Sequence, residues 1–164
     1  MVRLIGALML VLVVAFPSLG QQSLVGTYKI ISHVREINGI PTEPAGFEVN
    51  PHGYMVFTPT RIVTFLTAAK RKFGTSEAER AVLYDTLSGW SGTYRIEGNK
   101  IILNPDVSSY EYWNGTTRVL TWQFSGNRLT WTMGPVPWQG DQSKTLVTRL
   151  TWEKIEEAAQ LPYR

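Results

Sequence analysis

The sequence predicts an all-β protein, built as an antiparallel up-and-down barrel of eight to ten strands with one short helix. Leu24 to Glu36 alternates with period two, short turn signals separate most of the later apolar segments, and one segment has a convincing helical pattern. Parallel strands would need a crossover at every step, so short turns favour antiparallel neighbours. A closed barrel is favoured because closure removes the exposed sheet edges. A β-sandwich is the main alternative.

The first predicted strand, Leu24 to Glu36, organises the barrel. Its apolar residues fall mainly on one phase and its polar residues on the other, with Val25 and Ile31 as apolar exceptions. Gly26 lies early in the strand, where a missing side chain allows a sharp bend or a close backbone approach. His33 falls on the polar phase, which predicts an exposed position.

A hairpin and a helix follow. Residues 53–58 and 61–67 are predicted to pair across the turn at Pro59 and Thr60. The helix is expected over Thr75 to Leu87, with Thr75 or Ser76 as its cap and carboxylates in its first turn. The helix is a candidate lid or plug for the barrel.

From Trp90 onward the chain is predicted to be a meander, with turns at Gly98-Asn99, Asn114-Gly115 and Gly126-Asn127. Asn104-Pro105-Asp106 is expected to interrupt a strand. The predicted strands are 92–97, 100–104, 109–113, 118–124, 128–133 and 144–154, with a loop over 134–140.

Residues 1–20 predict a cleavable secretory signal peptide. Arg3 supplies a positive charge, Leu4 to Phe16 is apolar, and Ser18 and Gly20 are suitably placed for cleavage before Gln21. A membrane anchor is the alternative, but a spanning helix needs about 20 apolar residues. Cleavage would leave one β-barrel domain, 21–164, secreted or periplasmic and without a stable membrane span.

Composition argues against several classes of function. The chain has no cysteine and therefore neither disulfides nor thiolate chemistry, and its net charge of +3 gives little support for a nucleic-acid partner. Its two histidines lack nearby metal ligands, and neither a Gly-x-Ser-x-Gly motif nor a plausible pair of carboxylates is present, so no metal, cofactor or catalytic residue is predicted. Glu111, between two tyrosines, would have a raised pKa if it faced the barrel interior.

Aromatic residues occur on nearly all the predicted strands. An eight-stranded barrel is just wide enough to be filled by side chains or to hold one small ligand, and ligand cavities commonly have aromatic walls. The candidate cavity residues are Tyr28, Ile30, Tyr54, Phe57, Phe65, Tyr94, Ile96, Tyr110, Glu111, Tyr112, Trp122, Phe124 and Trp131.

Five segments, in order along the chain, carry a family resemblance: Leu24–Tyr28, Asn50–Pro59, Gly92–Tyr94, Gly126–Thr130 and Arg149–Glu153. Together they resemble the lipocalin-like domain family. The resemblance implies a calycin-type barrel with a central cavity, and it implies the fold more strongly than any activity.

The resemblance also implies a barrel-closing contact. Lipocalins carry Gly-x-Trp in the first strand, with a late arginine packed over the ring. Gly26 matches the glycine, Tyr28 stands where tryptophan is usual, and Arg149 is the expected partner.

The leading functional prediction is a secreted or periplasmic, non-enzymatic protein that binds a small hydrophobic or amphipathic molecule in the barrel. An isomerase or cyclase acting on a lipid-like substrate is one alternative, with Glu111 and a neighbouring tyrosine as its candidate groups. A protein-interaction module of the cell envelope is another. The sequence leaves the oligomeric state open.

Overall fold

A computed structural model describes residues 24–42, 51–138 and 140–155. The predicted signal peptide lies outside these ranges. The strands are β1 (Gly26–Ile37), β2 (Ile40–Thr42), β3 (His52–Phe57), β4 (Arg61–Thr67), β5 (Leu87–Glu97), β6 (Lys100–Ser108), β7 (Arg118–Ser125), β8 (Arg128–Trp138) and β9 (Asp141–Ile155). The helices are α1 (Glu77–Asp85) and the short 3₁₀-helix η1 (Glu111–Trp113).

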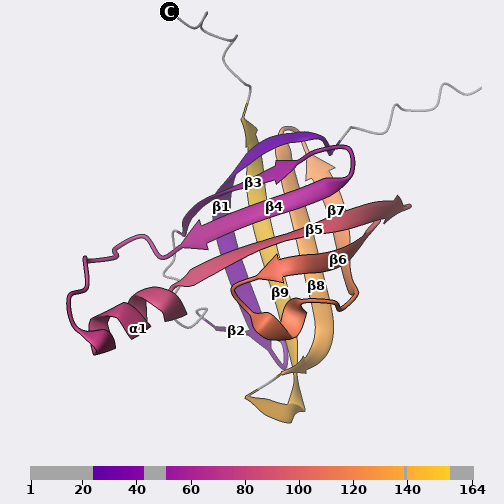
Figure 1. The fold of residues 1–164 in the computed structure, drawn as a ribbon. Helices are drawn as coiled ribbons and strands as arrows, with labels where there is room; N and C mark the ends of the chain where they lie inside the picture. Colours follow the sequence, from indigo (N-terminus) through magenta and orange to yellow (C-terminus); the bar gives the residue numbers. More distant parts are fainter. Residues whose placement is uncertain (1–23, 43–50, 139, 156–164) are drawn as a thin grey trace, which may run out of the picture.

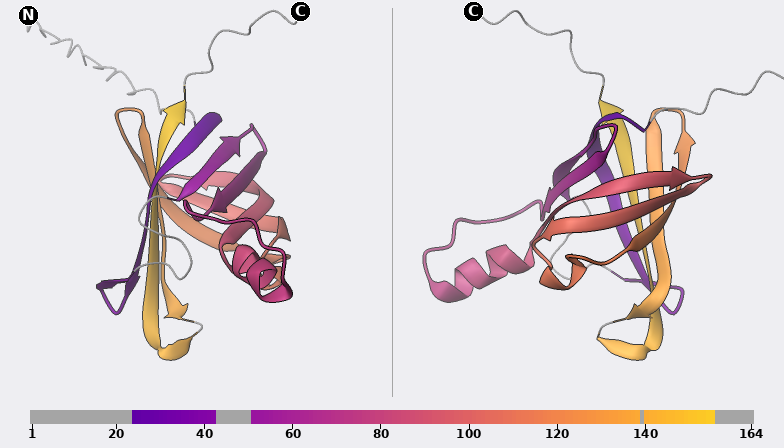
Figure 2. Two further views of the ribbon diagram at one scale, coloured as in Figure 1. Left: turned by 90° about the vertical axis from the view of Figure 1, so that its left-hand side faces the viewer. Right: turned by 45° about the vertical axis from the view of Figure 1, so that its right-hand side comes forward.

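The strands form one antiparallel sheet in the order β2-β1-β3-β4-β5-β6-β7-β8-β9, and β1 also pairs with β9 (Figure 1). This second pairing closes eight strands into a barrel and leaves β2 outside it (Figure 2). The predicted fold class is therefore confirmed, and closure rather than a sandwich satisfies the sheet edges.

Helix α1 begins as predicted but ends earlier. Ser76 accepts a hydrogen bond from the backbone N–H of Glu79, whose side chain accepts one from the backbone of Ser76 in return, forming a capping box. The helix stops at Asp85 because β5 starts at Leu87. None of its residues is buried, and it projects outward from the barrel (Figures 1 and 2).

Two predictions for residues 104–113 are wrong. Strand β6 continues through Pro105 to Ser108, because a register shift in its pairing with β5 places Pro105 opposite Gly92. Residues 109–113 are not a strand, since the backbone N–H of Trp113 bonds to the carbonyl of Tyr110 at 2.8 Å and starts the turn of η1.

The predicted loop over residues 134–140 is also shorter than expected. Strand β8 continues to Trp138, with a register shift against β9 between Met133 and Val136. The shift accommodates Gly134 and Pro135 without ending the strand.

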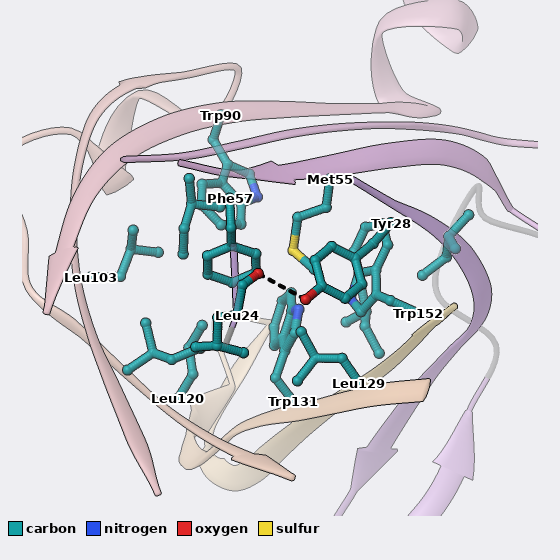
Figure 3. Close-up of a cluster of buried hydrophobic side chains, with 14 of the residues drawn as sticks. Leu24, Tyr28, Met55, Phe57, Trp90, Leu103, Leu120, Leu129, Trp131 and Trp152 are labelled. Atoms are coloured by element: carbon teal, nitrogen blue, oxygen red, sulfur yellow. Dashed lines mark hydrogen bonds between the residues drawn. The ribbon is translucent and has the colours of Figure 1, made fainter. Parts of the chain in front are cut away.

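One end of the barrel is filled by side chains (Figure 3). Tyr28 points into this packing, and its hydroxyl donates a hydrogen bond of 2.7 Å to the carbonyl of Leu24. The burial raises the pKa of Tyr28 to about 12. The fully buried apolar members include Met55, Phe57, Ile62, Ile101, Leu103, Leu129 and Trp152.

The cation above the Tyr28 ring is Lys154 rather than the expected Arg149. The Lys154 Nζ lies 5.8 Å from the centre of the ring, whereas Arg149 Nη1 bonds to Glu36 at 3.0 Å. Arg149 alternates with buried Leu150 and therefore faces outward. Gly26 has φ +146°, and an added Cβ would lie 2.7 Å from Lys154 Cε, so glycine makes room for this contact.

Candidate functional site

The other half of the barrel contains a cavity of about 600 Å³. This volume lies within the range of about 300–1,000 Å³ that is usual for small-molecule sites. Its wall shares Leu66, Trp90, Trp113, Trp131 and Leu150 with the buried core. The cavity therefore directly adjoins the packed end of the barrel.

The inward-facing residues of β9 belong first to the core and then to the cavity wall. On β9, Trp152 is in the core, and Leu150, Thr148 and Leu146 then line the cavity at successive inward positions. Register places Thr148 opposite Arg35 on one side and opposite Met133 on the other. Met133 also lines the cavity, so three neighbouring strands meet at this level.

A β-bulge in β1 turns two basic residues into the cavity. Ile30 pairs with Trp152 and Ser32 pairs with Thr151, which leaves Ile31 as an extra residue. The inward phase therefore changes at Ile31, and His33 and Arg35 line the cavity. The predicted exposed position of His33 is wrong for this reason, and the apolar Ile31 on a polar phase was the available signal.

Aromatic rings form a continuous wall between β5 and β7. The ring centres of Trp90 and Trp113 are 5.9 Å apart, those of Tyr110 and Trp113 are 6.0 Å apart, and those of Tyr110 and Tyr112 are 5.9 Å apart. Arg118 lies over Trp113, with its Cζ 4.9 Å from the ring centre. This wall offers flat apolar surface with a cation at its border.

Few polar groups face this surface. Thr64, Ser88 and Thr148 are buried and line the cavity. Burial raises the pKa of Tyr110, and the Ser88 side chain partly offsets this effect. The Thr64 hydroxyl, in contrast, has no hydrogen-bond partner among the described residues, although the residue is only 1 % exposed. An unsatisfied buried hydroxyl in a cavity wall is a place where a ligand can bond.

We expect Thr64→Val to raise the free energy of unfolding by about 1 kcal/mol, because it removes a desolvated hydroxyl that has no partner. Urea unfolding followed by circular dichroism measures the change. Thr121→Val, at an exposed position of β7, is the control and should change stability by less than about 0.5 kcal/mol. A loss of stability in Thr64→Val would show that the hydroxyl is already bonded.

The cavity wall is basic rather than acidic. His33, Arg35 and Arg118 line it, and no Asp or Glu does so within the described ranges. Burial, reinforced by the charge of Arg35, lowers the pKa of His33 to about 4, so the ring is neutral near neutral pH. The described residues also hold no cluster of three potential metal ligands.

The thirteen predicted cavity residues fall into three groups. Those in the cavity wall are Tyr110, Tyr112 and Trp131. Those in the core of the packed end, or packed against the core, are Tyr28, Ile30, Phe57, Tyr94, Trp122 and Phe124. Those exposed on the outside are Tyr54, Phe65, Ile96 and Glu111.

The outward residues follow from strand phase. Met55 and Phe57 are the buried positions of β3, so Tyr54 points outward, and Phe65 opposite it on β4 does the same. Glu111 lies in η1 on the surface, where its carboxylate accepts a hydrogen bond from Asn114 Nδ2 at 3.0 Å. Glu111 therefore does not face the barrel interior.

Tyr54, Val56, Val63 and Phe65 form an apolar surface on the β3–β4 hairpin, which we call the hairpin patch. All four are more than a third exposed. Tyr54 pairs with Phe65 and Val56 with Val63 across the two strands. The hairpin patch lies on the outer face of the barrel, opposite in phase to the cavity wall.

A closed eight-stranded antiparallel barrel with a cavity at one end is the architecture of a lipocalin-like protein. The family model of the lipocalin-like domain matches residues 25–155. The chain belongs to this lipocalin-like domain family, as the sequence resemblance indicated. Comparison with curated proteins gave no match. In the described part of the chain, no helix is long and apolar enough to cross a membrane.

Proposed function

We propose that this protein is a secreted or periplasmic carrier that binds a small hydrophobic or amphipathic molecule in the barrel cavity. The observation that carries the proposal is the cavity of about 600 Å³, walled by Trp, Tyr, Leu and Met side chains. Export is supported by the composition of residues 1–20.

The cavity suits an apolar molecule for a simple reason. Each Å² of apolar surface removed from water stabilises a complex by about 25 cal/mol before the costs of association are subtracted. Flat rings such as Trp90 and Trp131 are already held by the core, so they lose little freedom on binding. Thr64 and Thr148 provide hydroxyls that would orient one polar group.

Native mass spectrometry of the protein purified from its own host, with organic extraction, tests the proposal directly. A stoichiometric small apolar or amphipathic molecule supports the carrier. A clean unliganded mass, together with no thermal shift across a panel of hydrophobic compounds, contradicts it. That result would favour an interaction module, for which the hairpin patch is the candidate surface.

Filling the cavity should weaken binding. We expect Thr148→Trp to weaken binding of the neutral fluorescent probe N-phenyl-1-naphthylamine by at least about tenfold, since the new ring would occupy the probe's space. Fluorescence titration measures the affinity. Val119→Trp adds the same side chain on the exposed face of β7 and should leave the affinity unchanged. Equal affinities for both variants would place the probe outside the cavity.

The isomerase or cyclase alternative depends on an acid inside the barrel. Glu111 was its candidate, and this residue is on the surface. In the described ranges the cavity wall contains no carboxylate. The binding proposal is therefore the one that the geometry supports best.

A further inference from the structure

We propose that the ligand is an amphipathic anion, whose carboxylate is bound by Arg35 and Arg118 while its apolar body lies against the aromatic wall. This inference rests on the proposed function and specifies its ligand class. It is carried by the charge, the positions and the hydrogen-bonding state of the two arginines.

The two cavity arginines differ from other arginines of the barrel. Neither Arg35 nor Arg118 forms an ion pair within the described part of the chain. Four arginines that face away from the cavity each pair with a carboxylate: Arg61, Arg95, Arg128 and Arg149. A partly buried guanidinium without a counter-charge is costly, and an anionic ligand would remove this cost.

Arg118 is held in a fixed position. Its guanidinium lies over Trp113, and its Nε donates a hydrogen bond to Thr116 Oγ1 at 3.2 Å. Its two terminal nitrogens donate to no described residue. A guanidinium presents donors in a planar fork that matches a carboxylate, so these two nitrogens suit that group.

Arg35 lines the same cavity from β1. The β1 bulge turns it inward, and its charge acts on both His33 and the Tyr110 hydroxyl. Tyr110 packs against Trp113, and Trp113 lies beneath Arg118. The aromatic pair thus connects the surroundings of the two arginines, and both side chains line one cavity.

The remaining wall supplies the complementary part of the site. Trp90, Trp131 and Leu150 give the apolar floor, and no described carboxylate in the wall would repel an anion. The buried Thr64 hydroxyl also lacks a partner among the described residues and offers one further hydrogen bond. The wall is therefore mainly apolar and carries two arginines, which matches an amphipathic anion.

Displacement of N-phenyl-1-naphthylamine from the purified full chain tests the inference. Three competitors share one apolar body and differ in charge: dodecanoate, dodecan-1-ol and dodecylammonium. We expect dodecanoate to bind at least about tenfold more tightly than the alcohol, and dodecylammonium to bind most weakly. Arg35→Gln combined with Arg118→Gln should reduce dodecanoate to the affinity of the alcohol. Arg149→Gln removes an outward-facing positive charge and should preserve the preference.

The outcomes separate this inference from the proposed function. Equal affinities of the acid and the alcohol for the wild-type protein would overturn the inference, while binding of the neutral probe would still support a carrier. Failure of the wild-type protein to bind any of these compounds would overturn both. A preference for the acid that survives the double substitution would overturn the assignment to Arg35 and Arg118. If the double variant does not fold, the order of the three competitors on the wild-type protein decides.

Discussion

Replacing Trp152 with alanine is expected to lower the free energy of unfolding by about 3–5 kcal/mol. Trp152 is fully buried and stacks on Trp131, with ring centres 6.5 Å apart. It pairs with Ile30 on β1 and with Leu129 on β8, so it lies at the seam where the barrel closes. A loss of this size is a large part of the total stability of a domain, about 5–15 kcal/mol.

Packing rather than hydrogen bonding is responsible for this expected loss. The indole nitrogen of Trp152 has no hydrogen-bond partner among the described residues, so Trp152→Phe should lose less than Trp152→Ala. Urea unfolding followed by circular dichroism measures both. Trp138→Ala is the matched control at the cavity wall, where the ring is only partly buried and contacts Lys144. We expect it to lose about 1 kcal/mol. Equal losses for the two alanine variants would contradict the central position of Trp152.

Local signals explain why the fold class could be predicted. Strand periodicity is visible in β1, and turn pairs such as Asn38-Gly39 adopt positive φ, as expected for tight hairpin turns. The pairing of β1 with β9 joins residues more than a hundred positions apart. That contact was inferred from the general need to cover sheet edges, and no local pattern specifies it.

The site was harder to predict because a single extra residue reverses which side chains face inward. Register shifts occur in β1 after Ile30, between β5 and β6, and in β8 after Met133. In the sequence, Arg35 and Arg149 are both arginines on polar phases of long strands. The bulge at Ile31 places Arg35 in the cavity, whereas Arg149 faces outward because it alternates with buried Leu150 on β9.

Residue type alone does not distinguish cavity positions from core or surface positions. Aromatic residues were chosen for the cavity, yet Phe57 fills the core and Phe65 lies on the outer surface. Both are physically consistent uses of an apolar ring in a small barrel. Thr64, Ser88 and Thr148 were not predicted, because buried hydroxyls carry no sequence signal that distinguishes them from exposed ones.

Acidification is expected to destabilise the protein through His33 by about 2–3 kcal/mol. The pKa of this ring is lowered from 6.5 to about 4, by burial first and by Arg35 second. The unfolded chain therefore takes up the proton at higher pH than the folded chain. The contribution of neutral His33 to stability is complete above about pH 6.5 and is lost as the pH falls towards about 4. The partial exposure of the ring keeps the effect below the full value of about 3.4 kcal/mol for this shift.

Urea unfolding from about pH 8 to about pH 4 checks this expectation by comparing the wild-type protein with His33→Gln. The difference between the two should diminish over this range, whereas His52→Gln, which replaces the exposed histidine, should follow the wild type. Asp106 and Asp141, whose pKa values are lowered by hydrogen bonds, are present in all three proteins and cancel in the comparison. Parallel curves for the wild type and His33→Gln would show that the ring is solvated.

If dodecanoate occupies the cavity, its negative charge should offset that of Arg35 and make protonation of His33 less costly. The same titration with bound dodecanoate should therefore show a smaller loss of stability on acidification.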